Sequence, residues 1–140
     1  MSRAQEETNR RLLRARDVMD REYARPLDVR ALARAAHVSD AHFIRTFKLA
    51  FGETPHRYLQ RRRIERAMFL LRHTADPVGE ICLDVGFTSV GTFGRTFRSI
   101  VGVSPSAYRA AGPPPAPVPS CFAMAWTRPS SSGEAPGPRG

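Results

Sequence analysis

Residues 39–58 of the chain read SDAHFIRTFKLAFGETPHRY, and residues 89–108 read SVGTFGRTFRSIVGVSPSAY. Each stretch begins with serine, carries two phenylalanines one helical turn apart around an Arg-Thr pair, and continues to a glycine, a proline and a tyrosine. A match of this length predicts that a supersecondary unit has been duplicated. Two copies are too few for a solenoid, which needs about three or more stacked units.

The similarity continues upstream, where a shift of 49 residues pairs Leu32 with Ile81. One added residue in the turn at 86–89 accounts for the change in shift from 49 to 50. We therefore expect two units, at about 28–52 and about 76–102, each made of two helices and a tight turn.

Polar caps and helical spacing define the two helices of the first unit. Asp28 and Ser39 are expected N-caps because their side-chain oxygens can accept hydrogen bonds from free backbone amides, and Gly52 is the expected C-cap. The residues predicted to face inward are Val29, Leu32, Ala33 and Ala36 in the first helix, and Phe43, Phe47, Ala50 and Phe51 in the second. The second helix then presents to solvent Ala41, Arg45, Lys48 and Leu49.

The second unit repeats this plan. Asp76-Pro77 is expected to open its first helix, and Ser89 is expected to cap its second. The predicted inward residues are Val78, Ile81, Cys82 and Val85, followed by Phe93, Phe97, Ile100 and Val101, and the outward residues are Gly91, Arg95, Arg98 and Ser99. Both second helices hide paired phenylalanines and present arginine at the same angular position. The pattern therefore favours a helix-turn-helix reader over a helical bundle with a solvated arginine face.

A long helix is expected to join the two units. Thr54-Pro55 is an N-cap followed by proline at the first helical position, and the apolar spacing continues to about residue 74. A helix of about 18 residues spans roughly 27 Å, close to the ~34 Å between successive major-groove faces on one side of B-DNA, so one chain could reach two grooves. We expect most of the arginines of this helix to lie in solvent and some to lie along phosphates. They are Arg57, Arg61, Arg62, Arg63 and Arg66.

Flanking segments complete an all-α fold of about seven helices. Upstream of the first unit, we expect an amphipathic helix that covers this unit. Its apolar stripe consists of Leu12, Ala15, Met19 and Tyr23. Pro26 is expected to end that helix, and Ser104-Pro105 is expected to open a short last helix.

The composition divides the chain into three segments. We expect a polar lead at 1–11, the helical domain at 12–111 and a disordered tail, rich in Pro, Gly and Ser, at 112–140. The tail also holds apolar residues that could dock on the domain or on a partner, namely Cys121, Phe122, Met124 and Trp126.

The charge of the chain favours a nucleic-acid partner without establishing one. The formal net charge is +9, and of the 22 basic residues only Lys48 is lysine. Arginine suits phosphates and guanine edges better than lysine does. Basic charge is also typical of membrane-surface peptides and of solvated faces, so the decision rests on the spacing of the residues.

Several other classes of protein are disfavoured. No apolar run approaches the ~18 residues needed to cross a bilayer, so we expect no membrane partner. Cys82 and Cys121 fit neither a disulfide framework nor a zinc site, and they suit a reducing cytoplasm. We expect no enzyme, metal or cofactor, because the histidines neither cluster at metal spacing nor pair with a nucleophile; they are His37, His42, His56 and His73.

Three stretches of the second unit, 86–89 (GFTS), 93–98 (FGRTFR) and 102–109 (GVSPSAYR), resemble the signature region of the AraC/XylS family. The resemblance extends over about residues 12–110. It implies a bacterial, seven-helix, two-lobed domain that acts near promoters and puts one recognition helix of each unit into successive major grooves. It also implies an activator that contacts RNA polymerase. The chain has no room for a small-molecule effector domain, so it is similar to the small stand-alone members.

The resemblance also implies which residues contact DNA. The residues expected at base edges are Ala41, His42, Ile44 and Arg45 in the first unit, and Val90, Gly91, Thr92, Gly94 and Arg95 in the second. Those expected at phosphates are Ser39, Lys48, Arg61, Arg62, Arg66, Ser89 and Arg98. Arg45 and Arg95 are the main candidates, because one arginine can bond O6 and N7 of guanine together.

Some alternatives stay open at this point. Gly91 and Gly94 occupy positions where many members carry side chains, so the second helix is either less selective or approaches DNA closely through its backbone. His42 is either a polar contact or an ordinary surface histidine. A nucleic-acid-binding or architectural protein without sequence preference, and an interaction module built on the Trp126 tail, are the competing functions.

Overall fold

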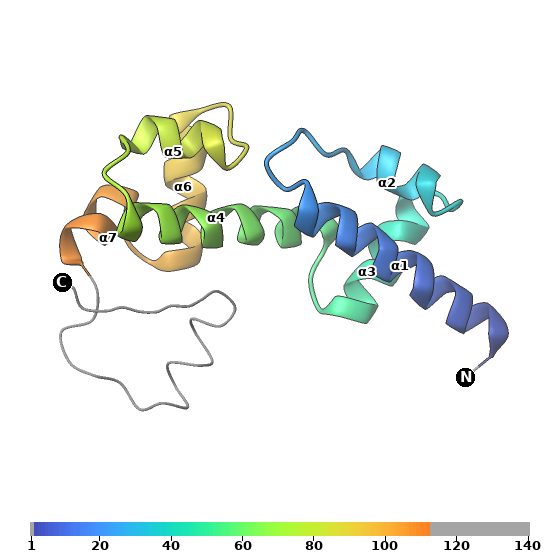
Figure 1. Cartoon of the computed structure of the whole chain (residues 1–140). Helices are drawn as coiled ribbons and strands as arrows, with labels where there is room; N and C mark the ends of the chain where they lie inside the picture. Colours follow the sequence, from blue (N-terminus) through green and yellow to red (C-terminus); the bar gives the residue numbers. More distant parts are fainter. Residues whose placement is uncertain (1, 113–140) are drawn as a thin grey trace. The chain divides into compact units, whose positions relative to one another are not determined.

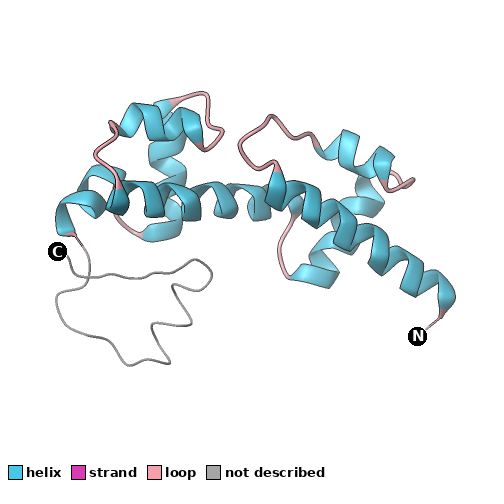
Figure 2. Cartoon of the chain, viewed as in Figure 1, coloured by secondary structure: helices cyan, strands magenta, loops and turns pink. Residues whose placement is uncertain are grey.

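Residues 2–112, which the computed structural model describes, form seven α-helices and contain no β-strand (Figures 1 and 2). In chain order the helices are α1 (Arg3–Arg21), α2 (Val29–Ala35), α3 (Asp40–Phe51), α4 (Pro55–His73), α5 (Val78–Asp84), α6 (Val90–Val101) and α7 (Pro105–Ala111). The predicted all-α fold with two helix-turn-helix units and a joining helix is confirmed. Residues 113–140, with the Cys121–Trp126 segment of the tail, lie outside the described residues.

The predicted caps explain where most of these helices begin and end. Each N-cap side chain accepts a hydrogen bond from a backbone amide two or three residues downstream, and the confirmed N-caps are Asp28, Ser39, Thr54 and Ser89. Gly52 ends α3 with φ at 82°, and Gly102 ends α6 with φ at 100°. This left-handed conformation favours glycine because a Cβ atom would be strained there.

The first helix differs from the prediction at both ends. It begins at Arg3, inside the segment expected as a polar lead, because Ser2 and Gln5 form a capping box. It ends at Arg21, with Glu22 as the C-cap, so the prediction that Pro26 ends this helix is wrong. Tyr23 consequently lies in the connection after the helix instead of on its stripe.

The helix α5 opens at the predicted Asp76-Pro77 pair: its N-cap is Pro77, without a side-chain cap hydrogen bond, and the Asp76 amide donates to Oγ1 of Thr74. One further detail of the prediction is wrong. Ala50 is exposed, although its repeat counterpart Ile100 packs partly buried against the second core. Both occupy the edge of the inward face, where only the longer isoleucine side chain makes the contact.

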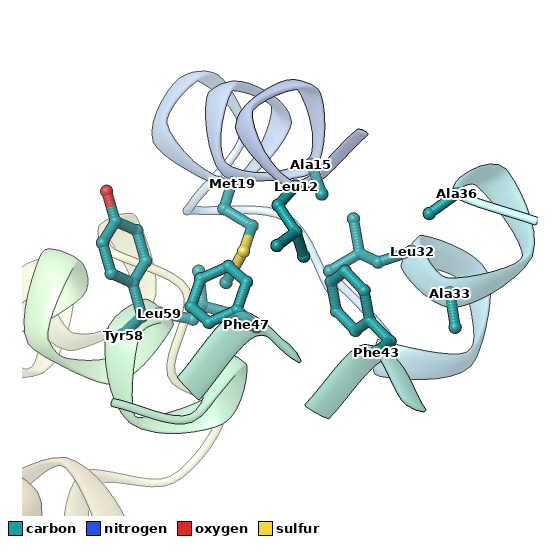
Figure 3. Close-up of a cluster of buried hydrophobic side chains, with 10 residues drawn as sticks. All are labelled: Leu12, Ala15, Met19, Leu32, Ala33, Ala36, Phe43, Phe47, Tyr58 and Leu59. Atoms are coloured by element: carbon teal, nitrogen blue, oxygen red, sulfur yellow. The ribbon is translucent and has the colours of Figure 1, made fainter. Parts of the chain in front are cut away.

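The first hydrophobic core lies between α1, α2, α3 and the beginning of α4 (Figure 3). Its buried residues are Leu12, Ala15, Met19, Leu32, Ala33, Ala36, Phe43, Phe47, Tyr58 and Leu59. The Phe47 ring packs edge-on against Tyr58, with ring centroids 5.7 Å apart. The Tyr58 hydroxyl donates a 2.7 Å hydrogen bond to Oδ1 of Asp20, which ties α4 to α1. We call this cluster and its helices the first lobe.

The second hydrophobic core uses the remainder of α4 together with α5 and α6. Its buried residues are Ile64, Ala67, Leu71, Ile81, Cys82, Val85, Phe87, Phe93 and Phe97. Cys82 is fully buried among these residues, as its position in the sequence predicts, and this burial raises the pKa of its thiol. We call this cluster and its helices the second lobe. The helix α4 therefore contributes one part of its length to each core.

Candidate nucleic-acid interface

The second helices of the two units, α3 and α6, have the same length and register. Each has 12 residues, a serine N-cap and a left-handed glycine C-cap. The side chains that fix their rotation are fully buried in both lobes, and these are Phe43 and Phe47 in α3 and Phe93 and Phe97 in α6. Because four phenylalanines hold the inward faces, the opposite faces are held toward solvent in the same register.

The outward face of α3 presents most of the predicted base-contacting residues together. Ala41, Ile44 and Arg45 are exposed, and His42 is half-buried. Nη2 of Arg45 lies 3.3 Å from Nδ1 of His42, one turn earlier in the helix. The arginine side chain is therefore anchored along the helix surface, with its other guanidinium nitrogens free to face a partner.

The outward face of α6 repeats this arrangement with different residue types. Val90, Gly91, Thr92 and Arg95 are exposed, and Gly94 is half-buried. Nη2 of Arg95 donates to Oγ1 of Thr92 over 3.4 Å, so Thr92 occupies the position that His42 has in α3. Both helices thus hold one arginine against the residue three positions before it.

The two glycines of α6 are not required by packing within the described chain. A Cβ atom at Gly94 would meet nothing within 4 Å, and one at Gly91 would lie 3.4 Å from Nη1 of Arg95, the end of a flexible side chain. Neither residue has the left-handed backbone seen at the C-caps. The space above this part of α6 is open, as an approaching backbone or base would require.

The predicted phosphate residues fall into two groups. Those at the ends of the recognition helices are exposed, namely Ser39, Lys48, Ser89 and Arg98. On α4, Arg61 bonds Glu53 and Glu65, and the bond to Glu53 raises the pKa of Arg61. Arg62 bonds Asp20 at 3.2 Å and Glu65 at 3.1 Å.

Arg66 differs from these two neighbours on α4. It is exposed, lies over the Phe69 ring at 4.8 Å, and forms no ion pair within residues 2–112. Of the three predicted phosphate arginines on α4, two are therefore already paired with carboxylates, and the third is available.

Three further arginines have structural contacts that the sequence reasoning missed. Arg63 donates to the backbone carbonyls of the segment after α1, and Arg109 donates to the carbonyls of Leu71 and Thr74 at the end of α4. The guanidinium of Arg72 lies 3.9 Å from the centre of the Tyr108 ring. A signal existed for Arg63, because it lies four residues from both Leu59 and Ala67 in the buried stripe of α4.

Neither a metal centre nor a membrane segment accompanies these helices in the described part of the chain. Over residues 2–112, no group of three or more His, Cys, Asp and Glu side chains could hold a metal ion. No helix in the same range is long and apolar enough to cross a bilayer.

Comparison with known proteins places these features in a family. A family model described as "Helix-turn-helix domain" matches residues 32–111. The chain is 32% identical over 91 residues to the regulatory protein SoxS of Salmonella typhimurium, covering 65% of this chain and 85% of SoxS. It is 40% identical over 78 residues to the HTH-type transcriptional regulator MtrA of Neisseria gonorrhoeae. That match covers 56% of this chain and only 26% of MtrA. The chain spans about a quarter to a third of the length of the other curated regulators that it matches at this level.

Solved structures agree with this assignment. The DNA-binding domain of AdpA, a global transcriptional factor solved in complex with a target DNA, is 32% identical, with a TM-score of 0.68. The match covers 71% of this chain and 90% of that domain. Other solved regulators with AraC-type DNA-binding domains share the fold. The chain belongs to the AraC/XylS-type helix-turn-helix family of DNA-binding transcription regulators.

Proposed function

We propose that this chain reads double-stranded promoter DNA sequence-specifically, with α3 and α6 each lying in a major groove. The observation that carries the proposal is the matched pair of exposed arginines, Arg45 and Arg95, at the same register of two helices anchored by buried phenylalanines. A recognition helix reads bases through its exposed face, and its partner helix holds it in place. A helix of 19 residues, roughly 28 Å long at 1.5 Å per residue, joins the two units.

The proposed base contacts follow from the exposed faces. Arg45 and Arg95 each bond O6 and N7 of a guanine, which is worth about 1–3 kcal/mol of discrimination against another base. The neighbouring residues proposed at base edges are Ala41, His42 and Ile44 on α3, and Val90, Gly91, Thr92 and Gly94 on α6. The apolar ones among them suit the methyl group of thymine.

The proposed phosphate contacts surround these base contacts. Ser39 and Ser89 lie at helix N-termini, where amides and the helix dipole favour an anion. Lys48 and Arg98 lie near the other ends of α3 and α6. Arg61, Arg62 and Arg66 of α4 complete the set. For the first two, a phosphate would have to share the guanidinium with the carboxylates that already bind it.

The role in the cell is proposed from the family to which the chain belongs. The domain at 12–111 binds a promoter in the bacterial cytoplasm and activates transcription by contacting RNA polymerase. The matched curated regulators are mostly longer, so this regulatory role is proposed only for the chain as given.

Substitution of the two arginines tests the proposal. The variants Arg45→Ala and Arg95→Ala are compared with Arg57→Ala, an exposed arginine on α4 outside the proposed contact set that removes the same charge. Arg45→Ala and Arg95→Ala should each lose preference for one guanine by roughly 5- to 150-fold, while Arg57→Ala keeps the wild-type preference. If the ratio of the affinities for matched and mutated sites is the same in all three variants as in the wild type, the assignment of these arginines to base edges is overturned.

A further inference from the structure

Arg63 lies on α4 between the residues that build the two lobes, and its guanidinium binds the backbone of the first lobe. Nε donates to the carbonyl of Tyr23 over 2.6 Å, and Nη2 donates to the carbonyl of Arg25 over 2.8 Å. Two donors of one planar guanidinium thus engage two carbonyls two residues apart. Lysine, with a single ammonium on a flexible stem, could not reproduce this geometry.

The same guanidinium also contacts the second lobe. Its carbon lies 5.9 Å from the centre of the Phe87 ring, and that ring is buried in the second core. Gly86 precedes this ring in the turn between α5 and α6, and a Cβ atom there would lie 2.8 Å from Nε of Arg63. Arg63 therefore touches both the segment after α1 and the turn before α6.

Gly86 is required at this contact for two reasons. Its φ of 106° is a left-handed backbone conformation that side chains rarely adopt. A Cβ atom would also lie 3.1 Å from both the Cα and the carbonyl oxygen of Ala24. The turn of the second lobe thus approaches the backbone of the first lobe directly, and Figure 1 shows these two connections next to each other beside α4.

The remaining contacts at this junction are apolar or backbone contacts. Tyr23 packs partly buried against both hydrophobic cores. Arg63 is half-buried and forms no ion pair within residues 2–112. The polar part of the junction therefore consists of the hydrogen bonds from Arg63 to two backbone carbonyls, and Tyr23 and the approach of Gly86 to Ala24 supply the apolar and backbone contacts.

We propose that Arg63 is a positioning residue that sets the spacing between the two DNA elements read by α3 and α6, by holding the Gly86 turn against the Tyr23–Arg25 segment. The inference rests on the proposed function, since spacing has meaning only if both helices read bases. Arg63 itself needs no contact with DNA. One inserted base pair moves an element by about 3.4 Å and rotates it by about a tenth of a turn, which a rigid pair of readers cannot follow.

The test uses the full chain and DNA duplexes that carry its two selected elements at the selected spacing, or with one or two base pairs added or removed. Arg63→Met keeps the aliphatic stem and removes every donor, and Arg57→Met is the matched control on the exposed side of α4. Arg63→Gln is measured in parallel because its amide can still donate to one carbonyl. Circular dichroism establishes the folded temperature range, and dissociation constants are measured within it.

The wild type and Arg57→Met should bind strongly only at the selected spacing. Arg63→Met should reduce the penalty for one inserted base pair by at least about fivefold, with unchanged base preference inside each element, and Arg63→Gln should show a smaller reduction. A spacing penalty equal to that of the wild type in a folded Arg63→Met or Arg63→Gln variant overturns the inference. Failure of the wild type to select two elements would instead count against the proposed function.

Discussion

Nη2 of Arg45 lies 3.3 Å from Nδ1 of His42 on α3, and Nη2 of Arg95 lies 3.4 Å from Oγ1 of Thr92 at the same register of α6. In each helix, the residue one turn earlier restricts an arginine that would otherwise sample many rotamers in solvent. Restricting a side chain before binding lowers the entropy lost on binding. The two lobes therefore restrict the arginine at the same position through different groups, the His42 imidazole in α3 and the Thr92 hydroxyl in α6.

Thr92→Val should therefore weaken the guanine preference of Arg95, because valine has a similar shape and no hydrogen-bond acceptor. The expected loss is about three- to tenfold at that base, corresponding to the net value of about one hydrogen bond. Thr92→Ser, which keeps the hydroxyl, should retain the preference. In an Arg95→Ala background, Thr92→Val should have no further effect at that base, and an undiminished effect there would show that Thr92 acts independently of Arg95.

The salt dependence of binding separates phosphate contacts from structural arginines. Arg66→Gln, Lys48→Gln and Arg98→Gln should each make the slope of log K against log salt shallower by about 0.9, the value expected for one lost phosphate contact. Arg61→Gln should change the slope less, because Glu53 and Glu65 already bind that guanidinium. Slopes that stay at the wild-type value in the first three variants would rule out their phosphate role.

Substitution of Gly94 tests why α6 carries glycine on its exposed face. Gly94→Ala should stabilise the domain by about 0.5–1 kcal/mol, because glycine has a low helix propensity and the new Cβ meets nothing within 4 Å. Thermal unfolding measures this change, and a fall in stability would contradict the open space around the Gly94 Cα. The DNA affinity of Gly94→Ala then decides between the two alternatives for this glycine. A lower affinity indicates that the backbone of α6 approaches DNA closely, and an unchanged affinity indicates that α6 is a less selective helix.

The hydrogen bond between Tyr58 and Asp20 predicts a stability difference that depends on pH. Burial, followed by the hydrogen bond to Asp20, raises the pKa of Tyr58 to about 12, from about 10 in the unfolded chain. Because the folded state favours the protonated phenol, its contribution is complete below pH 10 and is lost as the pH rises toward 12. Tyr58→Phe should cost about 1–3 kcal/mol at neutral pH.

The same variant tests the pH dependence directly. Chemical denaturation of the wild type and Tyr58→Phe at several pH values should give a difference in free energy of unfolding that narrows between pH 10 and 12. A difference that stays constant over this range would mean that the Tyr58 proton has the same affinity in the folded and unfolded states.

Much of the fold could be predicted because the sequence repeats its own signals. The duplicated phenylalanines give the inward faces of α3 and α6, and serine and glycine caps give the ends of these helices within a residue or two. These features are local, so they can be read from spacing alone. The exposed register of Arg45 and Arg95 follows directly from them.

Contacts between distant segments could not be predicted in the same way. The carbonyl partners of Arg63 lie about 40 residues before it in the chain, and no periodicity links a guanidinium to a backbone carbonyl. Arg62 likewise pairs with Asp20 across two helices. The early start of α1 did have a local signal, the Ser2–Gln5 capping box, which the polar composition of this segment concealed.

Selection of bound sequences from a random duplex library by the purified chain, at near-physiological salt, tests the central claim most directly. Two readers held in one chain predict two short enriched elements with centres about one helical turn apart, each dependent on one arginine, Arg45 or Arg95. A single enriched element would mean that only one of the two helices reads bases. No enrichment over the starting library would contradict sequence-specific recognition altogether.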